Sequence, residues 1–240
     1  MTRSARRVQL TPGYILHHRP YRDTSRILEV VTRDHGRISL FARGVRGPKA
    51  KLASILQPFQ MLLFSWNGRG EAAQLTAAES AQALAPLPSP ALMSAFYLNE
   101  LLLKLTTRHD PHPMLFDTYH EALDGLRAGG PLEPQLRVFE KRLLEALGYG
   151  LDLTRIDSDE YYLFRPEQGL VPTVADATGA LAGRSLLSLA NEHFTEAREL
   201  EDSKRLLQAA LAQCLEGRPI NTRTVARAVA RREAHTGSQS

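Results

Sequence analysis

The chain has 240 residues, of which 43% are hydrophobic and 23% are charged, as is usual for a folded globular protein. Its single cysteine, Cys214, excludes an internal disulfide and any zinc site that needs two thiolates. The sequence contains neither the apolar core of a signal peptide nor a run of about 18 apolar residues, so we expect a cytoplasmic protein that does not bind membranes.

The net charge of +4 is unevenly distributed along the chain. Residues 1–80 contain 13 Lys and Arg against 5 Asp and Glu, a balance of +8, whereas residues 81–240 carry a balance of −4. A basic first third joined to a mildly acidic remainder suggests two domains with separate tasks. We therefore expect a nucleic-acid-binding domain over residues 1–80 and a second domain over residues 81–240.

Alternating and apolar patterns predict five short strands in the first domain. These strands cover residues 8–19, 25–32, 37–42, 59–66 and 71–78, with a short helical turn at residues 52–56. Five strands with a small helical insert fit the oligonucleotide/oligosaccharide-binding (OB) barrel. An SH3-like barrel fits the strand count nearly as well.

Three prolines, Pro86, Pro88 and Pro90, mark the boundary between the domains, and apolar residues then recur with the period of a helix. Helices are predicted at residues 91–107, 113–127, 134–147, 184–191, 199–215 and 221–232, and a small hairpin at 161–164 and 169–171. The predicted fold class is α+β: an N-terminal five-stranded OB-fold barrel, then an all-helical domain with an irregular hairpin lobe over residues 151–183.

No motif of the sequence points to enzymatic chemistry or to a cofactor. Gly44 and Gly47 are separated by two residues rather than the four of a phosphate-binding loop, and Pro48 lacks the N–H that such a loop needs. His17 and His18 alternate on a strand, so they are not expected to share a metal. There is no Gly-x-Ser-x-Gly nucleophile elbow, and we therefore expect a protein that is not an enzyme.

Cations interleaved with aromatic residues are the strongest functional signal, because single-strand binding combines phosphate neutralisation with base stacking. The predicted DNA-binding residues of the barrel are Arg19, Tyr21, Arg22, Arg37, Arg43, Arg46, Lys49, Lys51 and Arg69. Tyr21, in a polar turn, is the preferred stacking residue, whereas Phe41 and Trp66 are interpreted as barrel core. A second cationic surface is predicted at Arg223, Arg227 and Arg231, which lie four apart on one helical face. The alternative for every cation is an ordinary solvated surface.

Eight stretches in order resemble one family across nearly the whole chain. They are Arg19-Pro20-Tyr21, Gly36-Arg37, Ala42-Arg43-Gly44-Val45-Arg46, Leu56-Gln57-Pro58-Phe59, Gly68-Arg69-Gly70-Glu71, Tyr97-Leu98-Asn99-Glu100-Leu101-Leu102, Leu136-Arg137-x-Phe139-Glu140 and Leu147-Gly148-Tyr149-Gly150. Together they resemble the RecO family of bacterial DNA repair and recombination mediators.

The resemblance implies ATP-independent binding of single- and double-stranded DNA and annealing of complementary strands, in association with the nucleoid. It also implies that the protein acts with RecR to load RecA onto DNA coated by single-stranded DNA-binding protein. The helical domain would take the acidic C-terminal tail of that coating protein. Arg137 is then the candidate cation for the tail, with Leu143 or Leu144 near an apolar pocket.

One departure from the family concerns metal. Many relatives carry four cysteines as a zinc module in the region that matches residues 151–183, and this sequence has none there, so no metal is expected. Packing of Tyr161, Tyr162, Leu163 and Phe164 is expected to replace it. Two other functions stay open from the residues alone: an RNA-binding or translation-associated barrel protein, and a protein–protein adaptor whose cations are only surface.

Overall fold

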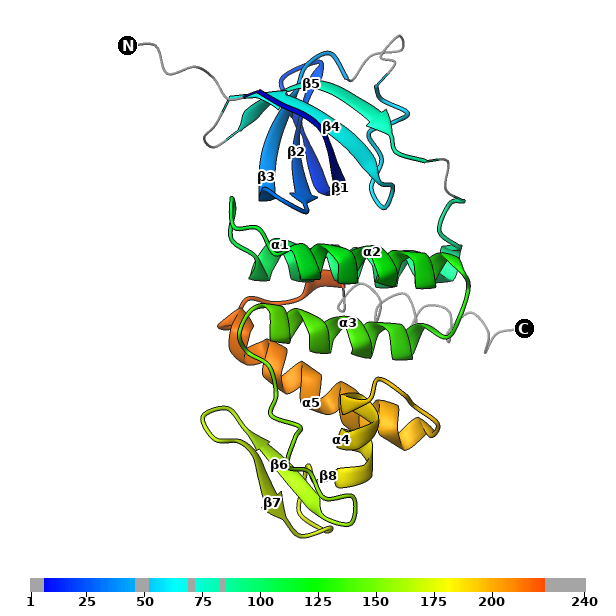
Figure 1. The fold of residues 1–240 in the computed structure, drawn as a ribbon, viewed down its shortest axis with the longest axis vertical. Helices are drawn as coiled ribbons and strands as arrows, with labels where there is room; N and C mark the ends of the chain where they lie inside the picture. Colours follow the sequence, from blue (N-terminus) through cyan, green and yellow to red (C-terminus); the bar gives the residue numbers. More distant parts are fainter. Residues whose placement is uncertain (1–6, 46–51, 69–71, 83–84, 223–240) are drawn as a thin grey trace, which may run out of the picture. The chain divides into compact units, whose positions relative to one another are not determined.

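A computed structural model describes residues 7–45, 52–68, 72–82 and 85–222. The chain forms two compact units, and neither is continuous in sequence. The first comprises Met1–Leu87 and Thr106–Asp117, and the second comprises Pro88–Leu105 and Thr118–Ser240. The elements of both are labelled in Figure 1.

The first unit is a closed five-stranded barrel (Figure 1). Its strands are β1 (Arg7–Tyr21), β2 (Ser25–Thr32), β3 (Gly36–Ala42), β4 (Leu62–Asn67) and β5 (Ala73–Ser80). They are arranged in the order β1-β2-β3-β5-β4, with β3 and β5 parallel and the other pairs antiparallel. This arrangement is that of an OB-like barrel, so the predicted fold is confirmed and the ambiguity left by strand counting is resolved.

Side chains alternate along β3, so every second one faces the barrel core. Ile38 and Leu40 point inward and are buried in the core, together with Trp66, which confirms the interpretation of Trp66. Phe41 lies on the opposite side of the strand and is not part of this core. The interpretation of Phe41 as core was wrong, because successive side chains of a strand point to opposite faces.

Residues 106–110 pack on the edge of β3. His109 N donates to the Arg37 carbonyl oxygen over 2.9 Å, and Arg37 and Arg108 form a parallel β-bridge. Gly36, with a φ of +66°, lies against the backbone of Asp110. The barrel unit therefore includes a piece of chain that no strand pattern within residues 1–80 could indicate.

The second unit is built around helices, and those predicted before residue 216 are confirmed. They are α1 (Ser89–Leu105), α2 (Pro113–Arg127), α3 (Leu132–Ala146), α4 (Gly183–Ala190) and α5 (Ala197–Leu215), and residues 113–117 of α2 are counted with the first unit. Leu98, Leu101, Phe139 and Leu207 are among its fully buried side chains. The predicted helix over residues 221–232 is described only at its first two residues, whose N–H groups donate to the Glu100 carboxylate over 2.8 Å.

The predicted hairpin lobe is present as a small three-stranded sheet. It consists of β6 (Tyr161–Arg165), β7 (Gly169–Thr173) and the short β8 (Leu181–Ala182), in the order β7-β6-β8. Tyr162 is buried, and its hydroxyl accepts a hydrogen bond from the Asp157 N–H. Among the described residues, no three His, Cys, Asp or Glu side chains lie together as a metal site, and no helix is long and apolar enough to cross a membrane.

Candidate nucleic-acid interface

The register of β1, β2 and β3 gathers predicted binding residues on one outer face of the barrel. Arg19 pairs with Ile27, and Ile27 pairs with Phe41, so these three side chains form a row across the strands. Tyr21, two residues after Arg19, lies on the same face at the end of β1, and Arg43 follows β3 directly. We call Arg19, Tyr21, Arg22, Phe41 and Arg43 the barrel-end cluster.

Aromatic and guanidinium groups of this cluster contact one another. The ring centroids of Tyr21 and Phe41 are 5.2 Å apart at an angle of 88°, an edge-to-face arrangement. The guanidinium carbon of Arg22 lies 5.4 Å from the Tyr21 centroid, and that of Arg43 lies 5.4 Å from the Phe41 centroid. Cation–π attraction therefore holds each arginine beside a ring, while Tyr21 stays 39% exposed.

Positive charge dominates this end of the barrel. Arg19, Arg22 and Arg43 are exposed, Arg26 is half-buried, and Asp23 is the acidic residue of the turn between β1 and β2. Within the described chain, Arg19 and Arg43 form no ion pair. Burial, together with the charges of Arg26 and His17, lowers the pKa of His18, so that imidazole is neutral at pH 7. Four cations against one acid favour a polyanion.

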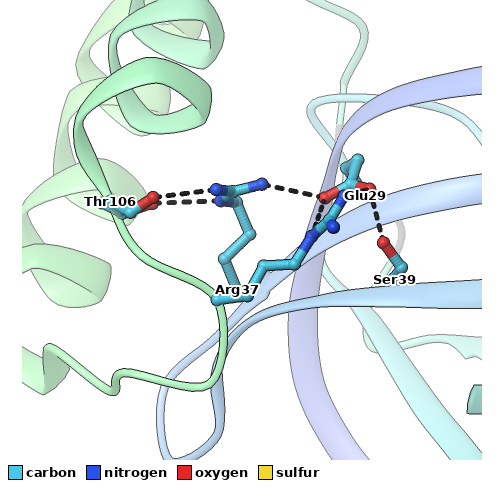
Figure 2. Close-up of polar contacts among 5 residues, drawn as sticks. Glu29, Arg37, Ser39 and Thr106 are labelled. Atoms are coloured by element: carbon cyan, nitrogen blue, oxygen red, sulfur yellow. Dashed lines mark hydrogen bonds and ion pairs between the residues drawn. The ribbon is translucent and has the colours of Figure 1, made fainter. Parts of the chain in front are cut away.

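Arg37 is committed to a network inside the barrel unit, which Figure 2 shows. Its Nη1 lies 3.0 Å from Glu29 Oε2, and its Nε and Nη2 donate to the hydroxyl and carbonyl oxygens of Thr106. Arg108 Nη2 and the Ser39 hydroxyl both donate to Glu29 Oε1. The Arg37 side chain is only 13% exposed and its charge neutralises Glu29, so DNA binding by Arg37 stays a prediction that this network does not support.

The structure thus brings together four of the predicted DNA-binding residues, Arg19, Tyr21, Arg22 and Arg43. Arg46, Lys49, Lys51, Arg69, Arg223, Arg227 and Arg231 lie outside the described residues. Sequence reasoning missed Phe41 and Ile27 as members of the same face. The signal for them was available, because the short turn after β2 sets the β2–β3 register and places Ile27 opposite Phe41.

A second candidate site lies in the helical unit, where a cavity of about 300 Å³ is lined by Met93, Tyr97, Leu136, Arg137 and Lys204, among others. Arg137 is 3% exposed and donates through Nη2 to Glu140 Oε1 over 3.1 Å. Tyr97 donates to the same oxygen over 2.6 Å. The Nε and Nη1 groups of Arg137 have no hydrogen-bond partner among the described residues.

The predicted apolar partners of Arg137 are corrected. Leu143 and Leu144 are fully buried in the helical core and do not line this cavity, because they lie on the part of α3 that packs inward. Met93 and Leu136 are its aliphatic lining residues. Leu136 directly precedes Arg137 in the same motif, so its position in the sequence could have suggested it as a lining residue of the cavity.

Comparisons with known proteins agree over almost the whole chain. Residues 7–84 match the family model described as Recombination protein O N terminal, and residues 90–224 match Recombination protein O C terminal. The DNA repair protein RecO of Methylococcus capsulatus is 44% identical over 229 residues, which cover 92% of this chain and 94% of the relative.

Two further relatives carry the same description. DNA repair protein RecO of Ralstonia nicotianae is 39% identical over 232 residues, which cover 93% of this chain and 85% of the relative. That of Azoarcus sp. is 40% identical over 233 residues, which cover 91% and 95% of the two chains. The chain belongs to the RecO family of DNA repair proteins.

Proposed function

We propose that this protein binds single- and double-stranded DNA through the barrel-end cluster and anneals complementary strands without ATP. The observation that carries the proposal is the grouping of exposed Arg19, Arg22 and Arg43 at one end of the outer barrel face, on which Glu29 is neutralised by Arg37 and Arg108. Phosphate contacts of this kind are independent of sequence. Annealing needs no nucleotide hydrolysis, because base pairing supplies the free energy once the repulsion between phosphates is reduced.

The family role extends the proposal to recombination. A protein that anneals strands and acts with RecR would help load RecA onto DNA coated by single-stranded DNA-binding protein. Two cationic surfaces serve annealing better than one, and Arg223, Arg227 and Arg231 remain the proposed second surface. In this proposal residues 1–80 supply the first DNA-binding surface, and residues 81–240 supply partner binding and the second cationic surface.

The Arg137 cavity is the proposed site for the acidic C-terminal tail of the coating protein. A tail carboxylate would accept hydrogen bonds from the unpartnered Nε and Nη1 of Arg137, and Lys204 would add a second cation at the rim. An apolar residue of the tail would contact Met93 and Leu136. Leu136→Asp leaves Arg137 in place but puts a negative charge in the cavity, so it should abolish binding of a labelled tail peptide without weakening DNA binding.

A salt titration tests the DNA proposal. Arg22→Ala combined with Arg43→Ala should weaken binding of single-stranded DNA and flatten the slope of log K against log salt by about 1.4, since each phosphate contact on a single strand contributes about 0.7. Annealing of complementary oligonucleotides without ATP should slow in parallel. The matched control is Arg165→Ala with Arg184→Ala, two exposed arginines of the helical unit.

An unchanged slope in the Arg22 and Arg43 double variant, with normal folding, removes both residues from the DNA site. Competition with RNA of the same base sequence separates the alternative function. An RNA-binding protein would prefer the strand that carries 2′-hydroxyl groups, whereas an annealing mediator holds DNA without them.

A further inference from the structure

The barrel-end cluster contains more than a cationic surface requires. Neutralising phosphates needs only arginine or lysine, yet here two aromatic rings stand edge to face on the outer side of the barrel, each with a guanidinium group beside it. Tyr21 is among the few large hydrophobic side chains of the described chain that are exposed. Part of its ring therefore faces solvent among the cations, where a nucleic-acid base can reach it.

Aromatic rings and guanidinium planes are both surfaces on which nucleic-acid bases stack. A base that stacks on Tyr21 or on the neighbouring Arg22 plane would bring its own phosphate close to the cations that already surround the rings. The partly exposed Ile27, next to Phe41 in the strand register, adds apolar area to the same platform. Base stacking of this kind tolerates every base, because each has a flat π face.

Only an unpaired base can use such a platform. Bases inside a duplex are stacked on their neighbours and hidden from the protein, so a duplex can contact the arginines but not the rings. We propose that Tyr21 and Phe41, with Arg22 and Arg43 beside them, form a base-stacking site that binds single-stranded DNA in preference to duplex and releases a strand as it becomes paired.

This inference rests on the proposed function and adds selectivity to it. The arginines supply attraction for both forms of DNA, and the rings supply a contribution that only the substrate of annealing receives. Pairing removes that contribution, so the product dissociates more readily than the substrate. The site thus favours dissociation of the paired product over that of the unpaired strand, which cations alone would not do.

The test compares two DNA probes at the same salt concentration. The first is a fluorescein-labelled oligo(dT), and the second is a duplex whose two ends are closed by non-nucleotide linkers, so that it has neither an unpaired base nor an exposed terminal base pair. Tyr21→Ala should weaken oligo(dT) binding about 5- to 150-fold, the equivalent of the ~1–3 kcal/mol of one stacked base, and should change duplex binding less than about twofold. Tyr21→Phe keeps the ring and should bind both probes as the unsubstituted protein does.

Two controls separate stacking from misfolding. Tyr149→Ala removes an exposed tyrosine of the helical unit and should change neither affinity. An oligonucleotide whose central positions lack bases should bind the unsubstituted protein about as weakly as oligo(dT) binds the Tyr21→Ala variant, and Tyr21→Ala should weaken it no further. Thermal unfolding of each variant checks that the barrel is intact.

Each outcome has one meaning. If the unsubstituted protein binds neither probe, the proposed function itself fails. If it binds both with the expected salt dependence but Tyr21→Ala weakens them equally or not at all, the base-stacking site alone is overturned. If Tyr21→Phe behaves like Tyr21→Ala, the hydroxyl rather than the ring is responsible, which also overturns it.

Discussion

Glu29 lies on the outer face of the barrel with two guanidinium groups around its carboxylate. Burial alone would raise its pKa, but hydrogen bonds from Arg108 and Ser39 and the charges of Arg108 and Arg37 outweigh burial, so the pKa is lowered. The charged form is thus favoured in the folded protein. Because two cations neutralise it, this carboxylate adds little repulsion to a face that is proposed to bind DNA.

Glu29→Gln should therefore destabilise the protein and change its acid sensitivity. A lowered folded-state pKa means that the stabilisation is present above the unfolded-state pKa and is lost as the pH falls through the folded-state pKa. At pH 7 the variant should lose about 1–3 kcal/mol of unfolding free energy, because the largely buried guanidinium group of Arg37 loses its carboxylate partner.

The difference in unfolding free energy between Glu29→Gln and the unsubstituted protein should decrease as the pH drops below 4.5, the ordinary pKa of glutamate. Denaturant titrations at several pH values measure this. Glu79→Gln, the same change at an exposed position of β5, is the control. If the difference in unfolding free energy between Glu29→Gln and the unsubstituted protein stays constant across the acid range, the lowered pKa of Glu29 is contradicted.

Asp23 is the acidic exception among the cations of the barrel-end cluster. Its carboxylate is exposed in the turn between β1 and β2, next to Arg22. Asp23→Asn should tighten DNA binding severalfold at low salt, because it removes a charge that repels phosphate, and the gain should shrink as salt rises and screens it. Anisotropy titrations at two salt concentrations measure the effect. Asp176→Asn makes the same charge change on the helical unit, and equal gains in both variants would show that only net charge matters.

At the scale of elements, the edge of β3 depends on one glycine. Gly36 has a φ of +66°, and a Cβ there would overlap the backbone of Asp110. Gly44 has nearly the same φ, +64°, but a Cβ there meets nothing within 4 Å. The two positions therefore share backbone strain and differ in whether the docked segment leaves room for a side chain.

Gly36→Ala should consequently destabilise the barrel unit more than Gly44→Ala does. Strain at positive φ costs both variants about 1 kcal/mol, and the overlap with Asp110 adds a further penalty that only Gly36→Ala carries. Hydrogen exchange of the His109 N–H, which donates to Arg37, should accelerate in the Gly36 variant alone. Equal unfolding free energies for the two variants would show that segment 106–110 is not held closely against β3.

Local patterns were sufficient to predict most elements. β2 and α2 were predicted with their observed bounds, since an apolar strand closed by a turn and a helix opened by proline are local signals. β4 begins at Leu62 rather than at residue 59, because Phe59 has a φ of +66° that no strand allows. The contact of Arg37 with Thr106 could not be predicted in the same way, since Thr106 is 69 residues away along the chain.

At the scale of the whole chain, charge and aromatic content indicated the kind of ligand, and the strand register then selected the residues. Arg19, Arg22 and Arg43 were predicted from composition, and the fold gathers them on one face. Composition could not separate them from Arg37, which differs from them only through Glu29 and Thr106. The sequence alone thus predicts that cations are concentrated in this domain, whereas only the barrel shows which of them are exposed.

The composition of the barrel unit leads to a prediction about fragments. Arg108 and Thr106 contribute to the Glu29 network, and Asp117 pairs with Arg33 of the β2–β3 turn, so residues 1–87 alone lack all three partners. Such a fragment should unfold at a lower temperature than one that ends at residue 117 with residues 88–105 replaced by a Gly/Ser linker of equal length. Arg108→Ala in the longer fragment should lower its unfolding temperature toward that of the shorter one, because the carboxylate of Glu29 then loses its second cation. If the two fragments melt together in thermal denaturation, the barrel does not need the segment after α1, and the network around Glu29 is only an accessory to a self-sufficient fold.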